Sequence, residues 1–507
     1  MTMRDDSVQE RRQDETRQAG EALVWDDVEP AQLDGVVARR LEQGERFAAL
    51  LADKDRGAPL LHAVLASDPK LPHSPGYYRV LSARLDGDPP AYPSLTQITP
   101  AAAVFQHALR QRAGYVAEGH EHAPLLHEES LPPASRSEWR IPKVDAPGAF
   151  QFSVGPVRSG VTEAQQFLFE TVGEEMLHLS VRLYYKHRGV EDACAGRDPE
   201  AALPLVERIS GRSSFAHALA FCQAVERIGG AAVPPRALYL RTLFAELERL
   251  YSHFHDLSDL CENTSLHVMN AQWAWLKEQA LRLNTKLGAP RYLRGLCSIG
   301  GVFLELDSER LRLLEEEIAS LAAQSDACAR LTNDAYSHIQ RLEATGTLTD
   351  QAAEDYACVG PVARACGLDI DARSSHPYAA YAQVEWRIAG YDGGDALARM
   401  RVRLQEIEQS LAILQSCARW LQDHPGEICA PPPAPAAGAG LGWSETPRGE
   451  ALHFVRLDDA GRIAAVRFRT PSLINWQPFP LTIAGIMMPD FAVNKASWNL
   501  SVAGNDL

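Results

Sequence analysis

The clearest hydrophobic pattern of the chain lies between residues 238 and 260. Apolar residues recur there at steps of three and four, which is the period of an α-helix with one buried face. They are Leu240, Leu243, Phe244, Leu247, Leu250, Tyr251, Phe254 and Leu257. Beside them Glu246, Arg249, His253 and Asp256 form a polar stripe at the same spacing. This stripe is either a solvated face, a set of internal pairs or the lining of a site.

Two more long helices are predicted further along the chain. The apolar residues after Asp307 and after Asp395 step by three and four, and each aspartate can cap its helix by accepting a backbone N–H. Such stripes usually mark core packing, so both segments are expected to join a helical bundle. The run 430–442 is rich in Pro, Ala and Gly, which predicts a loop between the bundle and a C-terminal tail that contains β-structure.

The N-terminal part has a mixed pattern. Residues 1–20 are polar and carry charges of both signs, which predicts a disordered tail. Residues 21–134 are predicted to form a small α+β domain. Within it, 59–68 and 77–85 have the pattern of two paired strands and 101–115 that of a helix.

The second domain is predicted to span residues 146–507, after a linker at 135–144. Its first part alternates between apolar and polar residues, which predicts a small antiparallel sheet. The three expected strands are 150–157, 165–172 and 178–185. Because the long helices follow this sheet, the predicted fold class is α+β throughout.

Composition limits the function classes. The chain has 507 residues with 50 basic and 66 acidic side chains, and its net charge of −16 argues against nucleic acid or an anionic lipid surface as the main partner. The nine cysteines contain no Cys-x-x-Cys, so the sequence indicates neither an iron-sulfur cluster, a zinc ribbon nor a disulfide framework. It also has no apolar run of about 18 residues and no signal peptide, which predicts a cytoplasmic chain without a membrane span.

Seven blocks of the sequence, always in the same order, carry a family resemblance. They are residues 182–191, 206–226, 238–260, 292–302, 360–381, 445–454 and 467–476. They resemble the large subunit of nickel-iron hydrogenases of the membrane-bound, formate-hydrogenlyase type and the quinone-site large subunit of respiratory complex I. Residues 92–126 are similar to the smaller complex I partner, which formate-hydrogenlyase enzymes likewise carry fused ahead of the large subunit.

The resemblance implies four positions for nickel ligands, and none of them holds a cysteine in this chain. The Cys-Gly-x-Cys block of such hydrogenases corresponds to Ser210 and Ser213, and the C-terminal Cys-x-x-Cys to Ser501 and Gly504. Thiolates hold nickel and iron in such a centre, so we predict that the nickel-iron centre is absent and that the chain has no metal ligands. The C-terminal extension that these hydrogenases lose after metal insertion is also expected to be missing, since the sequence stops three residues past Gly504.

Three residues are candidates for catalytic roles. His217 and His253 could carry protons near neutral pH, although each alone is more typical of a buried, hydrogen-bonded histidine. Arg448 matches the arginine that lies over the iron ligands in hydrogenases. Without the metal, it could instead orient a loop or pair with a carboxylate such as Glu445.

Three further residues are candidates for lining a cofactor cavity. In complex I, the sheet that matches 150–185 borders the quinone cavity, and the family's histidine after Gly-Pro-x is Arg158 here. His187 and Arg188 belong to the family's Tyr-x-His-Arg-Gly-x-Glu block. The same residues, followed by Glu191, could also form an ordinary turn with a local ion pair.

These features favour a non-hydrogenase large subunit of a membrane-associated oxidoreductase complex that is related to NADH dehydrogenase (quinone). The family resemblance also implies NAD binding. The chain would bind no cofactor itself and would shape a cavity for a quinone-like acceptor beside an iron-sulfur small subunit. Antiporter-like membrane subunits would hold it on the inner face of the cell membrane. One alternative is a non-catalytic scaffold or assembly subunit of such a complex. Another is a working nickel enzyme, which requires ligands that the sequence does not show.

Overall fold

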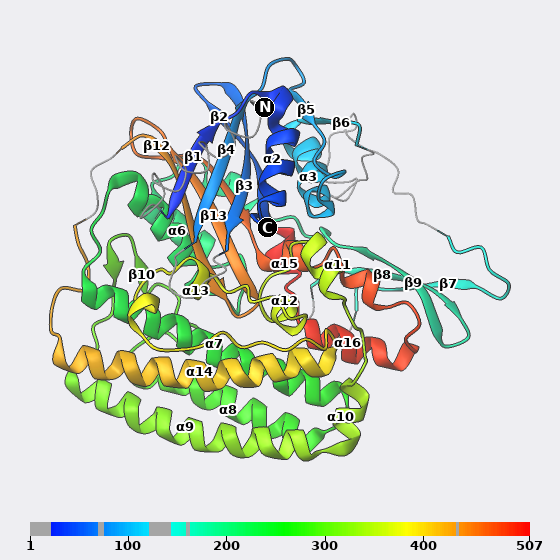
Figure 1. The fold of residues 1–507 in the computed structure, drawn as a ribbon. Coiled ribbons are helices and arrows are strands. Elements are labelled where there is room, and N and C mark those ends of the chain that lie inside the picture. The colour runs from blue at the N-terminus through cyan, green and yellow to red at the C-terminus, as the bar shows by residue number, and fades with distance from the viewer. Residues whose placement is uncertain (1–21, 69–75, 121–142, 159–162, 432–435) are drawn as a thin grey trace, which may run out of the picture.

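A computed structural model describes residues 22–68, 76–120, 143–158, 163–431 and 436–507 (Figure 1). The predicted disordered tail at 1–20 lies outside the described residues, as does most of the predicted linker at 135–144. The fold is a mixture of helices and small sheets, which confirms the predicted α+β class.

The N-terminal module is a four-stranded sheet in the order β1-β4-β3-β2 with two helices beside it. Its elements are β1 (Leu23–Asp27), α2 (Leu33–Glu42), β2 (Arg46–Asp55), β3 (Ala58–Ser67), β4 (Tyr77–Arg84), β5 (Ala91–Pro93), α3 (Ala103–Ala113) and β6 (Val116–Glu118). The predicted pairing of the third and fourth strands is confirmed, and so is the predicted helix. The sequence analysis missed β2, because a continuous apolar run lacks the alternation that marks a half-buried strand.

A second sheet begins the following part of the chain and projects from the body of the molecule (Figure 1). It consists of β7 (Phe150–Val154), β8 (Gln166–Val172) and β9 (Glu175–Arg182), paired antiparallel in that order. This confirms the predicted antiparallel sheet. The chain then runs through α4 (Val190–Cys194), α5 (Pro199–Val206) and α6 (Ser214–Gly229).

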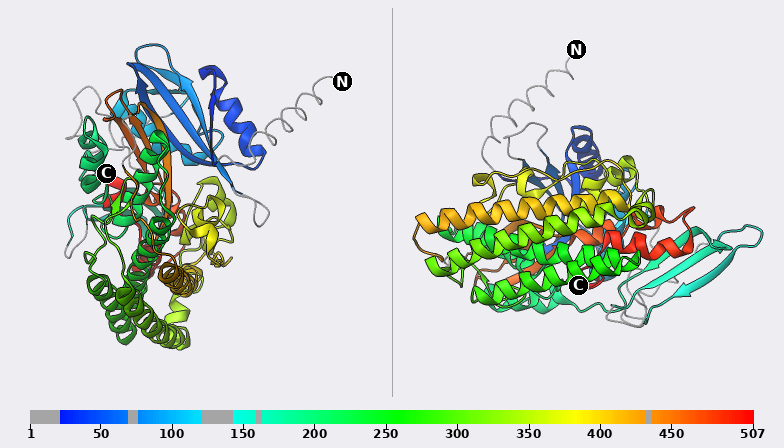
Figure 2. Two further views of the ribbon diagram at one scale, coloured as in Figure 1. Left: turned by 90° about the vertical axis from the view of Figure 1, so that its left-hand side faces the viewer. Right: turned by 90° about the horizontal axis from the view of Figure 1, so that it is seen from below.

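Four long helices form the bundle, with α7 and α14 nearest the rest of the molecule (Figures 1 and 2). They are α7 (Pro235–Asn263), α8 (His267–Lys286), α9 (Ser308–Asp334) and α14 (Ala396–Asp423). The two predicted caps are confirmed, because the carboxylate of Asp307 accepts the N–H of Arg310 and that of Asp395 accepts the N–H of Ala398. Between α9 and α14 lie α10 (Tyr336–Leu342), α11 (Asp350–Asp355), α12 (Pro361–Ala365) and α13 (Ala372–Ser375).

The C-terminal part is a third sheet followed by short helices. Its elements are β12 (Gly438–Thr446), β13 (Gly449–Leu457), β14 (Ile463–Arg469), α15 (Pro471–Asn475), α16 (Phe491–Trp498) and α17 (Ala503–Asp506). The predicted loop at 430–442 is wrong for its last five residues, which belong to β12. The reason is packing: the helix α6 lies so close to this strand that a Cβ on Gly442 would stand 1.9 Å from the carbonyl oxygen of Ala220.

The N-terminal module packs on this third sheet through buried charges. Glu450 of β13 accepts hydrogen bonds from the hydroxyl of Tyr78 at 2.7 Å and from the guanidinium of Arg46 at 2.9 Å. One hydrophobic core runs from this module through the sheet into the bundle. No helix among the described residues is long and apolar enough to cross a membrane.

Candidate functional site

The polar stripe of α7 is buried. Glu246, Arg249, His253 and Asp256 are at most 2% exposed, so the interpretation as a solvated face is wrong. Ionic groups withdrawn from water must be compensated by partners of opposite charge or by hydrogen bonds. Glu246 and Arg249 pair with each other at 3.3 Å, which confirms the alternative of internal pairs in part. The stripe also pairs with residues from distant parts of the chain, such as Arg373 and Glu406.

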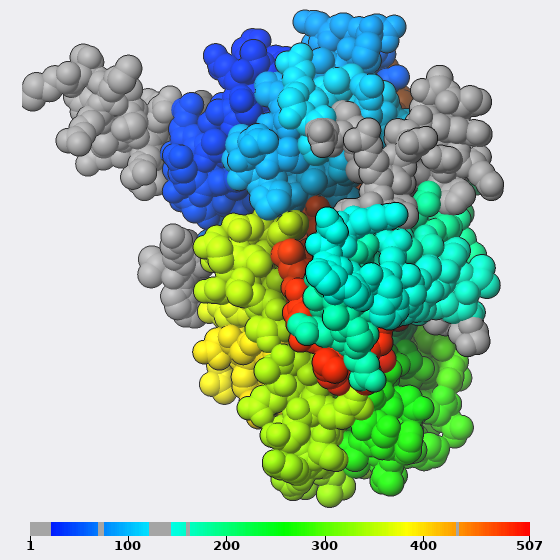
Figure 3. Space-filling model, turned by 90° about the vertical axis from the view of Figure 1, so that its right-hand side faces the viewer, coloured from blue at the N-terminus to red at the C-terminus, as the bar shows by residue number. Residues whose placement is uncertain are grey.

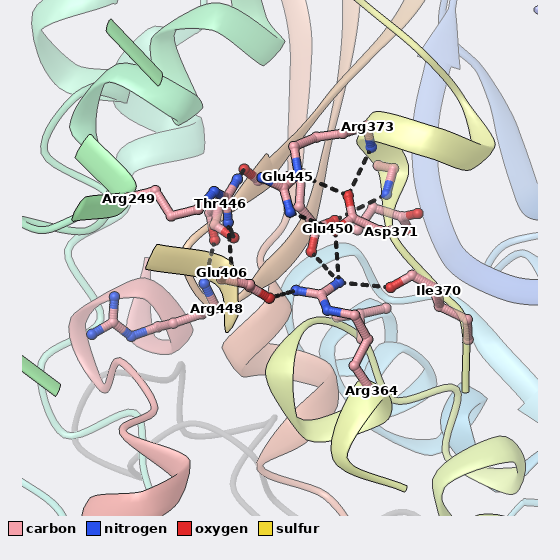
Figure 4. Close-up of polar contacts among 12 residues, drawn as sticks. Arg249, Arg364, Ile370, Asp371, Arg373, Glu406, Glu445, Thr446, Arg448 and Glu450 are labelled. Atoms are coloured by element: carbon pink, nitrogen blue, oxygen red, sulfur yellow. Dashed lines mark hydrogen bonds and ion pairs between the residues drawn. The ribbon is translucent and has the colours of Figure 1, made fainter. Parts of the chain in front are cut away.

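One group of partners surrounds α12 and the end of β12 (Figure 4). The guanidinium of Arg364 binds Glu406 of α14 and lies 3.0 Å from Glu445, while Arg373 binds Asp371 at 2.7 Å. Burial opposes ionisation of Glu406, but Arg364 and His253 outweigh it and hold the pKa of that carboxyl well below its ordinary value. Burial and the nearby Asp371 act the other way on Glu445 and raise its pKa to about 7.

A second group surrounds Asp256, one turn further along α7. Its carboxylate lies 2.9 Å from Arg212, 3.3 Å from Arg403 and 3.7 Å from Arg448. Burial raises the pKa of this carboxyl, but the three arginines together lower it to about 2. Asn499 completes the group by donating a hydrogen bond to Asp256 at 2.5 Å.

Arg448 lies in the turn between β12 and β13, but its carboxylate neighbour is Asp256 and not Glu445. Its Nε donates to the carbonyl oxygen of Asn499 at 2.7 Å. Its two terminal nitrogens are buried and make no hydrogen bond with any described residue. Burial and the nearby Arg212 lower the pKa of Arg448 to about 9. The prediction that Arg448 pairs with a carboxylate is confirmed, but the suggested carboxylate, Glu445, is wrong. The alternative role of orienting a loop agrees with the bond to Asn499.

The four positions that match metal ligands come from two segments that meet beside Arg448 and Asn499. A side chain on Gly504 would place its Cβ 3.1 Å from the Oγ of Ser501 and 3.6 Å from the Cβ of Ser210. The N–H of Ser213 donates to the carbonyl oxygen of Ser210 at 3.1 Å, which holds the first pair in one turn. The donor set is hydroxyl groups and a glycine, which does not fit a nickel-iron centre that needs soft thiolates. The described part of the chain holds no group of three or more His, Cys, Asp or Glu side chains arranged for a metal ion.

The two candidate histidines are both buried and hydrogen-bonded. His217 and His453 share a contact of 3.0 Å between ring nitrogens, and burial together with Arg448 lowers the pKa of His217 to about 3. His253 lies 2.6 Å from a carboxylate oxygen of Glu406, and burial still lowers its pKa. Both rings are therefore neutral at pH 7, and a role in proton transfer stays a prediction.

His187 and Arg188 lie next to the C-terminal segment that contains Ser501 and Gly504. Arg188 donates to the carbonyl oxygens of Ile209 at 2.9 Å and Ala503 at 2.6 Å, so it ties the loop before α6 to the C-terminal segment. His187 lines a cavity of about 360 Å³ between the N-terminal module and this segment. The expected local ion pair of Glu191 is wrong, because this carboxylate binds Arg112 of α3 at 2.8 Å.

Arg158 lines a different cavity, also of about 360 Å³, between the projecting sheet, the end of α7 and α16. Asn499 lines this cavity as well, and it contacts both Asp256 and Arg448. The cavity thus adjoins the buried charges, and Arg158, a candidate for lining a cofactor cavity, lies in its wall. The space-filling view shows the C-terminal segment (red) reaching the surface beside this sheet (cyan) (Figure 3).

Several residues of the site were not identified from the sequence. Arg364, Arg373, Glu406 and Arg403 are charged residues within apolar helical or turn segments, and that pattern is the only local signal of their burial. Their partners are far away in the sequence, so the pairing itself could not be read from the chain.

The family comparison assigns the chain to a superfamily. The model of the 49 kDa subunit of respiratory-chain NADH dehydrogenase matches residues 268–437 and 427–506, and the model of nickel-dependent hydrogenases matches residues 188–281. The chain belongs to the superfamily that contains the complex I 49 kDa subunit and the nickel-iron hydrogenase large subunit. This confirms the resemblance seen in the sequence.

The relatives come from both branches of this superfamily. The carbon monoxide-induced hydrogenase of Rhodospirillum rubrum is 28% identical over 67% of this chain and 94% of its own length. Formate hydrogenlyase subunit 5 of Escherichia coli is 26% identical over 80% of this chain and 75% of its own length. An NADH-quinone oxidoreductase subunit of Protochlamydia amoebophila is 26% identical over 71% of this chain and 96% of its own length.

A solved structure shares the fold. A chain of the membrane-bound sulfane sulfur reductase, described as an archaeal respiratory membrane complex, superposes with a TM-score of 0.67 at 23% identity. The match covers 71% of this chain and 99% of that chain. It shows that the two chains share a fold over the matched part.

Proposed function

We propose that this chain is the large subunit of a membrane-associated oxidoreductase complex and does not act as a nickel-iron hydrogenase. It shapes a cavity for a quinone-like electron acceptor beside an iron-sulfur small subunit. The observation that carries the proposal is the meeting of Ser210, Ser501 and Gly504 at one point without a thiol, next to a cavity lined by Arg158 and Asn499. The segments that resemble the metal-binding segments of nickel-iron hydrogenases meet here, but they lack the ligand atoms that such a metal centre requires.

Elemental analysis of the purified chain, with nickel supplied during expression, tests the first half of the proposal. We expect far less than one nickel per chain and no hydrogen uptake, because hydroxyl groups bind nickel weakly. A variant that restores all four cysteines at 210, 213, 501 and 504 is the matched control for metal uptake. About one nickel per unmodified chain would contradict the proposal.

Capture of the tagged chain from its native membrane tests the second half. A redox role needs an electron carrier close by, and this chain has no clustered cysteines of its own. We expect an iron-sulfur protein to be captured with it, seated against the segment 210–217, whose last four residues begin α6, and against the projecting sheet. Antiporter-like membrane subunits on the inner face of the membrane should be captured as well.

Gly211 lies exposed in that segment, so Gly211→Trp should block the partner without disturbing the core. Gly426→Trp, at an exposed glycine of the loop after α14, is the matched control. A chain that elutes alone would favour the scaffold alternative, and so would an intact complex whose turnover does not respond to added quinone.

A further inference from the structure

The cavity between the projecting sheet and α16 combines aromatic walls with cationic side chains. The rings of Phe169, Trp476 and Phe491 line it, and so do Arg158 and Lys495. Aromatic walls suit a flat ring system, because they offer stacking and edge contacts. The cations decide which ring systems fit best.

Neither cation is neutralised within the described part of the chain. The Nε and Nη2 atoms of Arg158 are closed off from solvent and have no hydrogen-bond partner there, while the guanidinium lies 5.5 Å from the centre of the Phe167 ring. Lys495 makes no ion pair with a described residue, and burial followed by repulsion from Arg158 lowers its pKa. The one carboxylate among the lining residues, Asp259, attracts Lys495, but burial raises the pKa of Asp259 and it forms no ion pair with either cation among the described residues.

The wall therefore carries two partly desolvated cations against a single carboxylate, which is unfavourable, and a ligand that brings a negative charge would reduce this cost. A charge-assisted hydrogen bond to an ionised oxygen is about twice as strong as one to a neutral carbonyl. The free Nε and Nη2 atoms of Arg158 form a fork that fits such an oxygen.

We propose that this cavity takes an acceptor whose flat ring system carries an ionised oxygen, in preference to a neutral quinone. The ionised oxygen would accept hydrogen bonds from Arg158 and Lys495, while the ring packs among Phe169, Trp476 and Phe491. This inference rests on the proposed function, because it specifies the acceptor class of the same cavity.

Two naphthoquinones of the same ring size provide the test. 2-Hydroxy-1,4-naphthoquinone is an anion at pH 7, whereas 2-methoxy-1,4-naphthoquinone is neutral. Titration calorimetry on the full chain should show the anion binding about tenfold more tightly at low salt, with the preference shrinking at high salt. Equal affinity for the two compounds would overturn the inference and leave the proposed function standing. Failure of both compounds to bind would contradict the proposed function as well, because the cavity would then take no quinone-like acceptor.

Variants of Arg158 and Lys495 test whether the preference for the anionic compound arises in this cavity. Lys495→Met and Arg158→Leu should each reduce the preference to about one- to threefold, and Lys495→Arg should retain it because the charge is kept. Lys286→Met removes an exposed lysine of α8 that pairs with Glu317 and should leave the preference unchanged. Circular dichroism confirms that each variant is folded. An unchanged preference in the folded Lys495→Met and Arg158→Leu variants would contradict the assignment to this cavity.

Discussion

Asp256 is the residue of the buried site whose substitution should lower the free energy of unfolding most. Its carboxylate forms an ion pair with each of Arg212, Arg403 and Arg448, and the residue is 2% exposed. Asp256→Asn would leave these cations uncompensated, so we expect the free energy of unfolding to fall by about 3 kcal/mol in urea denaturation. The control Asp326→Asn removes an exposed carboxylate of α9 and should change the free energy of unfolding by less than about 0.5 kcal/mol. A loss as small as the control's would mean that the arginines are satisfied without Asp256.

The same carboxylate should make stability depend on pH. Its pKa is lowered from 3.8 to about 2 in the folded chain, so its contribution is fully present above pH 3.8 and is lost as the pH falls towards 2. That contribution is about 2 kcal/mol. We therefore expect the stability difference between the unmodified chain and Asp256→Asn to narrow between pH 4 and pH 2, measured by denaturation across that range. A difference that stays constant would show that the carboxylate titrates normally.

At the residue scale, the sequence predicted which side chains matter but not what they touch. The stripe Glu246, Arg249, His253 and Asp256 was visible from its spacing, because helical period depends only on local sequence. Its distant partners could not be identified, because Arg373 and Glu406 belong to other helices more than 100 residues away. The expected pair of Arg448 with Glu445 failed for the same reason: Glu445 is the nearer residue in sequence, but Asp256 is the nearer carboxylate in space.

At the element scale, the strand β12 depends on glycines that look like loop residues in the sequence. A Cβ on Gly442 would lie 1.9 Å from the carbonyl oxygen of Ala220 and 2.6 Å from the N–H nitrogen of Ala224, so α6 and β12 could not keep their distance. Gly442→Ala should lower the free energy of unfolding by about 3 kcal/mol or more, measured by urea denaturation.

Gly35→Ala is the matched control for this substitution. Gly35 lies inside α2 with nothing within 4 Å of its added Cβ, so the same change should be neutral or raise the free energy of unfolding by about 0.5 to 1 kcal/mol. Equal effects at the two positions would contradict the close-packing explanation for β12.

The elements that the sequence predicted well are those with a period of their own. The long helices α7, α9 and α14 and the caps at Asp307 and Asp395 follow from local spacing and local hydrogen bonding. The strands β2 and β12 do not, because one is buried along nearly its whole length and the other is built largely of small residues at its start. Tertiary contact, not local pattern, decides both.

At the scale of the whole molecule, the N-terminal module is held by buried charge. Glu450 of β13 accepts hydrogen bonds from the hydroxyl of Tyr78 and from the guanidinium of Arg46, while Arg469 lies 3.2 Å away on the neighbouring strand. Burial opposes ionisation of Glu450, but Arg46 and Arg469 outweigh it and lower its pKa to about 2. The carboxylate is therefore ionised at neutral pH and links the N-terminal module to the C-terminal sheet that contains β13.

Removing this charge should loosen the module without unfolding the helical bundle. In Glu450→Gln, Arg46 and Arg469 lose their shared anion, so we expect the amides of β2 and β3 to exchange hydrogen about tenfold faster or more, because their opening free energy falls by at least ~1.4 kcal/mol. Amides of α8 and α9 should exchange at the unmodified rate, since these helices lie on the far side of the molecule (Figure 1). Glu317→Gln, at the exposed pair with Lys286, should leave both regions unchanged. Faster exchange in the bundle as well would mean that the module and the bundle open as one unit, as their continuous hydrophobic core allows.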